Sequence, residues 1–150
     1  MMERRNVLAG LAALSTAATY AAPSWAQQSR ETAKRMPMGA MTVQDCVESC
    51  LRSHSACLET ATYCLEKGGM HTAAAHLTLL LDCAEICQTT ANSMLRRSPQ
   101  HAVLCAACAQ ICDACAQSCE VIGDDEEMRR CAKTCRDCAA SCRDMSKRGI

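Results

Sequence analysis

The sequence contains almost no aromatic side chains. It has no phenylalanine, one tryptophan and two tyrosines in 150 residues. A folded core must therefore be built from small and aliphatic side chains, among which cysteine packs as a small hydrophobe. An excess of charge of one sign is missing as well, because 16 Lys and Arg residues balance 16 Asp and Glu residues. This balance gives no support for binding to nucleic acid or to an anionic membrane surface.

Several cysteine motifs are also absent. No C-x-x-C pair is followed by histidine, which excludes attachment of a c-type haem, and the cysteine run of bacterial ferredoxins is missing. No nucleophile–base pair or open catalytic site is recognisable, so we do not expect an enzyme. Outside the N-terminus no apolar run approaches the roughly 20 residues that span a bilayer, so we expect no membrane span in the mature chain.

Cysteine, by contrast, is abundant. The chain has 15 cysteines, one residue in ten, which is the level of disulfide scaffolds in short secreted chains. The densest stretch, residues 105–119, reads CAACAQICDACAQSC, with gaps of 3, 4, 3 and 4 residues. Because an α-helix turns once in about 3.6 residues, this spacing places all five thiols on one helix face. It is a heptad pattern with cysteine where a coiled coil has leucine.

Similar spacing recurs in three other segments, and together they predict four helices. Thr42 is a suitable N-cap for the first helix, and Gly68 is suited to end it. The expected helices cover residues 42–67, 70–97, 99–121 and 125–147. Short connections between helices of this length make antiparallel neighbours. The predicted fold class is therefore all-α, an antiparallel up-down-up-down four-helix bundle with a cysteine-lined core.

All 15 cysteines fall on the faces that these helices are expected to turn inward. They are Cys46, Cys50, Cys57, Cys64, Cys83, Cys87, Cys105, Cys108, Cys112, Cys115, Cys119, Cys131, Cys135, Cys138 and Cys142. Two histidines are assigned to the same faces, His54 between Cys50 and Cys57, and His76 further along the chain. Each is either a metal ligand or a core histidine that is hydrogen-bonded.

Residues 1–26 have the pattern of an export signal peptide. Arg4 and Arg5 form a twin arginine before a small, weakly apolar run, and Ser24-Trp25-Ala26 matches the small-x-small cleavage pattern. The twin arginine favours the twin-arginine route, with the general secretory route as the alternative. We therefore expect an exported, periplasmic protein that is cleaved after Ala26. Residues 27–41 then form a methionine-containing leader, and residues 42–150 the bundle.

One end of the predicted bundle collects methionines and a histidine. In an up-down bundle the start of the first and third helices meets the end of the second and fourth. The residues expected at this end are Met36, Met38, Met41, Met94, His101 and Met145. Two interpretations stand side by side, ordinary filling of gaps in the packing and a thioether-lined mouth through which metal enters.

A disulfide or thiol redox scaffold is one interpretation of so many cysteines in an exported chain. Residues three or four apart on a helix have Cβ atoms about 5–6 Å apart, whereas a disulfide needs about 3.5–4.5 Å. Disulfides would therefore have to join different helices, and 15 thiols leave at least one unpaired. A metal-free core that uses cysteine only for packing is a further alternative, but so many cysteines on four registered faces exceed what packing requires.

Zinc or general heavy-metal sequestration is the main alternative among metals. A closed site of Zn(II) with four thiolates has a net charge of −2, and several such sites in one apolar core are costly without buried cations. One Cu(I) per thiolate is neutral, and thiolates and thioethers are the soft ligands that suit Cu(I). This charge balance favours storage or buffering of multiple Cu(I) ions.

The cysteine segments resemble those of the bacterial copper storage proteins. The resemblance covers residues 42–147 approximately and rests on CVESCLRSHSACLETATYC, DCAEIC, CAACAQICDACAQSC and CAKTCRDCAASC. It implies a cysteine-lined four-helix bundle that stores many Cu(I) ions per chain, with a methionine-containing open end for entry. It also implies that the 15 cysteines, from Cys46 to Cys142, are the metal ligands. It also implies a homotetramer of bundles and, for exported members, passage through the twin-arginine route.

Overall fold

A computed structural model describes residues 41–122, 125–148 and 150, which lie in one compact unit of the chain. Within these residues the chain is helical and contains no strand. The helices are α2 (Val43–Lys67), η1, a 3₁₀ turn (Gly69–Thr72), α3 (Ala74–Leu95), α4 (His101–Ile122) and α5 (Glu126–Met145). The predicted signal peptide and all of the leader before Met41 lie outside the described residues.

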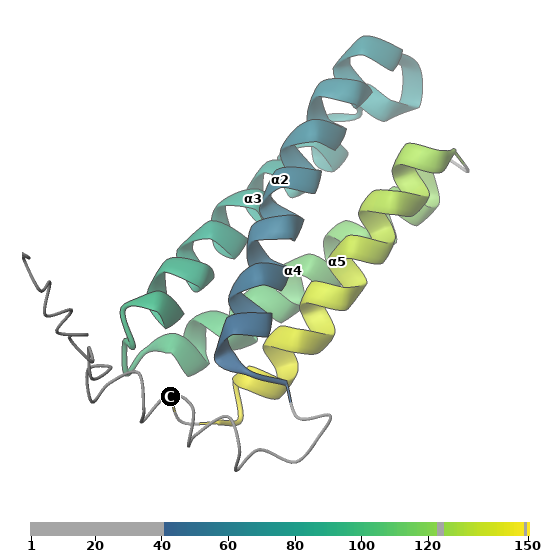
Figure 1. Ribbon diagram of the computed structural model, residues 1–150. Helices are drawn as coiled ribbons and strands as arrows, with labels where there is room; N and C mark the ends of the chain where they lie inside the picture. The colour runs from purple at the N-terminus through teal and green to yellow at the C-terminus, as the bar shows by residue number, and fades with distance from the viewer. Residues whose placement is uncertain (1–40, 123–124, 149) are drawn as a thin grey trace, which may run out of the picture. The chain divides into compact units, whose positions relative to one another are not determined.

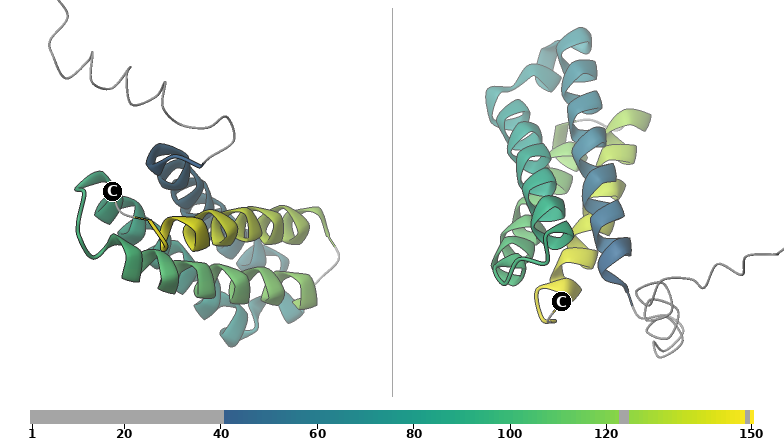
Figure 2. Two further views of the ribbon diagram at one scale, coloured as in Figure 1. Left: turned by 90° about the horizontal axis from the view of Figure 1, so that it is seen from below. Right: turned by 60° about the vertical axis from the view of Figure 1, so that its left-hand side comes forward.

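The four long helices form an antiparallel bundle (Figure 1). Helix α2 packs against α3, α3 against α4, α4 against α5, and α5 back against α2, so each helix has two neighbours. Figure 2 shows α4 and α5 running side by side, and α2 beside α3. The predicted all-α four-helix bundle is confirmed. We call the end that holds Met41, Met94 and Met145 the methionine end, and the end at the α2–η1 connection the Gly68 end.

Local sequence sets the limits of α2. The Thr42 hydroxyl accepts a hydrogen bond from the backbone N–H of Asp45 at 3.0 Å, and the Asp45 carboxylate accepts one from the N–H of Thr42 at 2.9 Å. This reciprocal capping box satisfies two N–H groups that the first turn leaves free. At the other end Gly68 and Gly69 have φ values of +74° and +63°, which favour glycine and stop the helix.

The second helix differs from its prediction at both ends. We expected it over residues 70–97, but α3 begins at Ala74 and ends at Leu95. After the two glycines the chain makes only one 3₁₀ turn, and the extended backbone of Ala73 (φ −56°, ψ 126°) separates that turn from α3. Arg97 has a positive φ of 52° and turns the chain toward α4, which begins at His101.

Helix α4 is long and apolar enough, by length and composition alone, to cross a membrane. Its inward face, however, packs into the bundle and is buried from His101 to Cys119. Its outward face takes part in ion pairs, since Asp113 contacts Arg136 and Arg143 of α5, and Glu120 also contacts Arg136. These contacts identify α4 as a core helix of the bundle.

Candidate metal centre

The interior of the bundle is lined with thiols. All 15 cysteine side chains have an exposed fraction of zero, and all 15 are free thiols. The prediction that every cysteine faces inward is therefore confirmed. Alanines complete the lining where helices approach closely, among them Ala84 and Ala91 of α3 and Ala116 of α4. The core is thus built from small side chains, as the shortage of aromatics requires.

The thiols gather into groups whose sulfur atoms all lie within 4.8 Å of one another. Each group draws on at least two helices. From the methionine end toward the Gly68 end, the groups are Cys46–Cys105–Cys142, Cys50–Cys108–Cys138–Cys142, Cys87–Cys108–Cys112–Cys138, Cys57–Cys83–Cys115–Cys135 and Cys115–Cys119–Cys131. Cys64 belongs to none of them.

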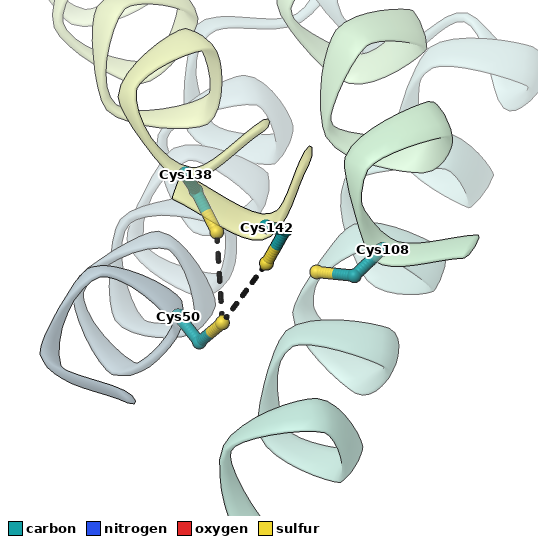
Figure 3. Close-up of side chains that lie close together, drawn as sticks. All are labelled: Cys50, Cys108, Cys138 and Cys142. Carbon is teal, nitrogen blue, oxygen red and sulfur yellow. Dashed lines mark hydrogen bonds between the residues drawn. The ribbon is translucent and has the colours of Figure 1, made fainter. Parts of the chain in front are cut away.

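Figure 3 shows one of these groups. Cys50 comes from α2, Cys108 from α4, and both Cys138 and Cys142 from α5, and the four side chains point toward a common space. The sulfur of Cys50 lies 3.5 Å from that of Cys142 and 3.8 Å from that of Cys138. Cys138 and Cys142 are one helical turn apart, so α5 supplies two thiols to the same side of the group.

The distances between sulfurs suit a shared metal ion. The closest pair, Cys87 and Cys112, is 3.4 Å apart, and Cys57 and Cys115 are 3.9 Å apart. Two sulfurs that are each about 2.3 Å from one ion lie roughly 3.8 Å apart at a tetrahedral angle and about 4.6 Å apart on opposite sides of it. These separations also exceed a disulfide bond, which is about 2.05 Å long. Ions therefore fit between the thiols after small movements of the side chains.

Most neighbouring groups share members. Cys108, Cys138, Cys142 and Cys115 each belong to two groups, so the five groups use 14 thiols in total. Sharing joins the groups into two sets, one of eight thiols toward the methionine end and one of six toward the Gly68 end. The sulfurs of Cys83 and Cys112 lie 3.6 Å apart and connect the two sets, so the thiol lining is continuous. Five divalent ions, one for each group, would bring ten positive charges to these 14 thiolates and leave four negative charges unbalanced. Within residues 41–122, 125–148 and 150 no lysine or arginine is buried, so no side-chain cation offsets that charge.

The surroundings of Cys64 and Cys115 favour the protonated thiol in the absence of metal. Burial raises the pKa of the Cys64 thiol from an ordinary 9.0 to about 11, and the nearby Cys131 and Asp125 add to the increase. Hydrogen bonding with Cys119 and Cys131 raises the pKa of Cys115, and burial acts in the same direction. A metal ion must therefore displace protons as it binds, because the thiolate is the ligand.

One position on the inward face of α2 differs from the prediction, whereas its four cysteines face inward as predicted. We placed His54 there, but its ring is half-buried and its Nδ1 lies 2.9 Å from the carbonyl oxygen of Ala84. The core position is Ser53, which is fully buried. The Ser53 hydroxyl oxygen lies 3.6 Å from the sulfur of Cys135 and 4.0 Å from that of Cys83. The spacing Cys46, Cys50, Ser53, Cys57 continues the alternation of 4 and 3 residues, so this signal was present in the sequence.

The methionine end brings together part of the predicted mouth. Met94 is buried, with its sulfur 3.9 Å from that of Cys105, and Met145 is buried in the same core. Met41 is half-buried, and its sulfur accepts a hydrogen bond of 2.6 Å from the hydroxyl of Ser141. Met36 and Met38 lie outside the described residues.

His101 has a different environment from that expected of a ligand at the mouth. Its Nδ1 lies 3.0 Å from the carbonyl oxygen of Ser98, and its Nε2 lies 2.8 Å from the carbonyl oxygen of Arg148. Both ring nitrogens thus contact backbone oxygens, which leaves neither directed at the thiols. The ring joins the α3–α4 turn to the C-terminal end of the chain.

His76 lies at the Gly68 end, close to the one cysteine outside the groups. Its ring is buried, with Nε2 3.6 Å from the Cys64 sulfur and Nδ1 2.8 Å from the hydroxyl oxygen of Ser118. Sequence patterns did not indicate Ser118, because it lies on the half-buried side of α4. Nearby, Asp125 caps α5 and accepts hydrogen bonds from Lys67 and His71, which closes this end of the bundle.

Fold and site together define a class of protein, the four-helix bundle whose core is a continuous lining of thiols. Residues 40–147 match the family model described as copper storage protein. The match includes all four helices and all 15 cysteines. The chain therefore belongs to the copper storage protein family.

Solved structures resemble this chain over about 70% of its length. A crystal structure of a protein from Nitrosospira multiformis is 46% identical, covers 70% of this chain and 94% of its own, and has a TM-score of 0.66. The Cu(I)-bound copper storage protein BsCsp3 is 36% identical, covers 69% of this chain and 96% of its own, and has a TM-score of 0.65. A cytosolic copper storage protein from Streptomyces lividans, in a structure with five coppers, is 30% identical, with coverages of 71% and 92% and a TM-score of 0.66.

A cysteine-rich protein of uncharacterised function from Bacillus subtilis, YhjQ, is 37% identical over 66 residues. The match covers 44% of this chain and 61% of that relative.

Proposed function

We propose that this protein stores Cu(I) ions on the thiolates of its bundle core. The observation that carries the proposal is the continuous lining of 14 buried cysteines, in which shared thiols form two sets of groups and the Cys83–Cys112 contact at 3.6 Å connects the sets. Cu(I) balances a thiolate one to one, so the core can fill without accumulating charge. The Cu(I)-bound state of BsCsp3 and the five coppers in the Streptomyces lividans relative support the same use of this fold. All 15 cysteines are the proposed ligands, and the function needs no catalytic residue.

Anaerobic titration of the fully reduced protein tests this function. Cu(I) and Zn(II) are added in separate experiments, and bound metal is measured after gel filtration against a count of free thiols. Storage predicts saturation at about ten or more Cu(I) per chain and clearly fewer Zn(II), because only the monovalent ion keeps the core neutral. Saturation at one or two Cu(I), or equal uptake of both metals, contradicts it. Few free thiols in metal-free protein would instead support a disulfide scaffold.

We propose further that copper enters at the methionine end. Met94 touches the thiol group nearest that end through Cys105, and Met41 lies at the start of α2. Thioethers bind Cu(I) without displacing a proton, so they can pass an ion to thiolates at low cost. Met94→Leu keeps the volume of the side chain and is expected to slow loading in stopped flow while leaving the final capacity unchanged. Leu80→Met, a buried change away from this end, is the control.

Export remains a proposal that rests on the first 26 residues. The twin arginine, the apolar run and the small-x-small pattern support passage to the periplasm, whereas one relative is a cytosolic protein. Replacing Arg4 and Arg5 by lysine is expected to retain the protein in the cytoplasm if the twin-arginine route is used. Unchanged periplasmic yield after cell fractionation would favour the general secretory route.

Assembly into a homotetramer is the last part of the proposal. Leu51, Leu58 and Leu65 recur every seven residues on α2 and are 37%, 40% and 63% exposed. Such an exposed apolar stripe on a helix suits packing against a second copy. Leu58→Glu is expected to lower the mass of the assembly measured by light scattering, whereas Lys133→Glu on the exposed face of α5 is expected to leave that mass unchanged.

A further inference from the structure

Cys64 is set apart from the other thiols. It is fully buried, yet it belongs to none of the five groups that share thiols along the core. The polar atom that contacts its sulfur is Nε2 of His76, at 3.6 Å. His76 comes from α3 and Cys64 from α2, so the pair joins two helices at the Gly68 end.

The other ring nitrogen of His76 determines which atom faces Cys64. Nδ1 lies 2.8 Å from the Ser118 hydroxyl oxygen, which can accept a hydrogen bond from an Nδ1–H group. In that tautomer Nε2 carries a lone pair and points at the thiol. Histidines that bind metals are held in this way, with the second ring nitrogen donating to a neighbouring oxygen. The other nearby histidine, His71, is not available, because its Nε2 contacts Asp125 at 2.9 Å.

We propose that Cys64 and His76 form a separate mixed sulfur–nitrogen site for one Cu(I) ion at the Gly68 end. This inference rests on the proposed storage function and adds a ligand that is not a thiol. With metal–ligand distances of about 2.0–2.3 Å, the two atoms must lie roughly 3.6 Å apart at a tetrahedral angle or about 4.3 Å apart in a linear arrangement. The observed 3.6 Å therefore allows an ion with less than ~1 Å of side-chain movement.

Charge and ligand number favour Cu(I) over Zn(II) at this pair. One thiolate and one neutral imidazole make a neutral site with Cu(I), whereas Zn(II) would leave a buried positive charge. Closed zinc sites in proteins use four ligands, and the close contacts of this pair supply only two. Imidazole is also a good ligand for copper, so nitrogen can replace a second sulfur. Binding forms one Cu–S and one Cu–N bond and releases the Cys64 proton to solvent, with no change of oxidation state.

Nitrogen NMR of the native chain tests the site directly. Protein with ¹⁵N-labelled histidine is titrated anaerobically with Cu(I), and the ring nitrogens are followed to saturation. The proposal predicts a large shift of the His76 Nε2 resonance, with the Nδ1–H signal retained. If many Cu(I) ions bind and His76 Nε2 does not move, the mixed site is wrong while storage stands. If the native chain takes up only one or two ions, storage fails and this site fails with it.

Matched variants give a second readout. Cys64→Ala, His76→Gln and the double variant are each expected to bind one Cu(I) fewer than the native chain, because each removes the same ion. His54→Gln is the control, since it removes a histidine whose ring contacts a backbone carbonyl instead of a thiol. Native capacity in folded His76→Gln would overturn the proposal, as would a double variant that loses two ions.

Discussion

Replacing Ser53 by cysteine tests whether copper capacity follows the number of thiols in the core. Ser53 is fully buried on the inward face of α2, in line with Cys46, Cys50 and Cys57. Its hydroxyl oxygen lies 3.6 Å from the Cys135 sulfur. A thiol at this position would therefore extend an existing group of four thiols without new space having to open.

The expected gain is about one Cu(I) per chain, because each added thiolate balances one more cuprous ion. A cysteine sulfur extends only a few tenths of an ångström beyond a serine oxygen, and sulfurs in this core already lie 3.4 to 3.9 Å apart. The change loses weak hydrogen bonds from Ser53 to two thiols, worth together about 1 kcal/mol or less. Cysteine recovers part of that loss as a buried apolar side chain. The free energy of unfolding should thus change by less than about 1 kcal/mol.

The assay compares Ser53→Cys, Ser53→Ala and native protein in parallel anaerobic titrations with Cu(I). A thiol count in denaturant establishes that the cysteine variant has one more free thiol, and circular dichroism establishes the fold. Capacity is expected to rise only in Ser53→Cys. If the extra thiol is present and reduced but bound copper does not increase, the argument from one-to-one charge balance is refuted. Copper capacity would then depend on how many positions between the thiols can hold an ion, and not on the number of thiolates.

Three further predictions follow from the same structure. Apparent Cu(I) affinity should fall as the pH is lowered, by up to about tenfold per pH unit for each thiol that must lose its proton. Competition with a copper chelator at several pH values measures this affinity, and an affinity that does not depend on pH would contradict the prediction. Metal-free protein should lose stability as the pH rises, because the pKa of Cys64 is raised from 9.0 to about 11 in the folded state. The protonated Cys64 thiol contributes its full share to the free energy of unfolding below pH 9. About 2–3 kcal/mol of that free energy is lost between pH 9 and pH 11. Denaturant melts should show this loss reduced in Cys64→Ala, and equal losses in both proteins would rule out Cys64 as the cause. Asp125→Ala should lower the free energy of unfolding by about 1–2 kcal/mol, because it removes the N-cap of α5 and its contacts with Lys67 and His71; Glu126→Ala, exposed on the next residue, should change it by less than about 0.5 kcal/mol.

The sequence was sufficient for the fold and for the direction of the thiols. Alternating gaps of 3 and 4 residues are a property of the helix itself, so they place side chains on one face before any tertiary contact is known. The capping box at Thr42 and Asp45 and the stop at Gly68 are equally local, and α2 begins and ends as predicted. Export, by contrast, depends on residues that the structure does not describe.

Side chains between the cysteines were harder to place. Ser53 and His54 are adjacent, and either fits a helix face near Cys50 and Cys57. Only the crossing of α2 with α3 decides that Ser53 enters the core while His54 reaches the Ala84 carbonyl. His101 is similar, because its two carbonyl partners come from a turn and from the C-terminal end of the chain, which helical periodicity does not describe.

The sequence by itself determined that this protein presents 15 thiols along four helical faces, because that outcome depends only on the 3.6-residue turn. The tertiary structure alone decided which thiols meet. Sulfurs from different helices come within 3.4 to 3.9 Å because the helices are registered against one another along the bundle, and that register depends on packing across the core. The same packing leaves Cys64 without a thiol group and gives it a histidine partner.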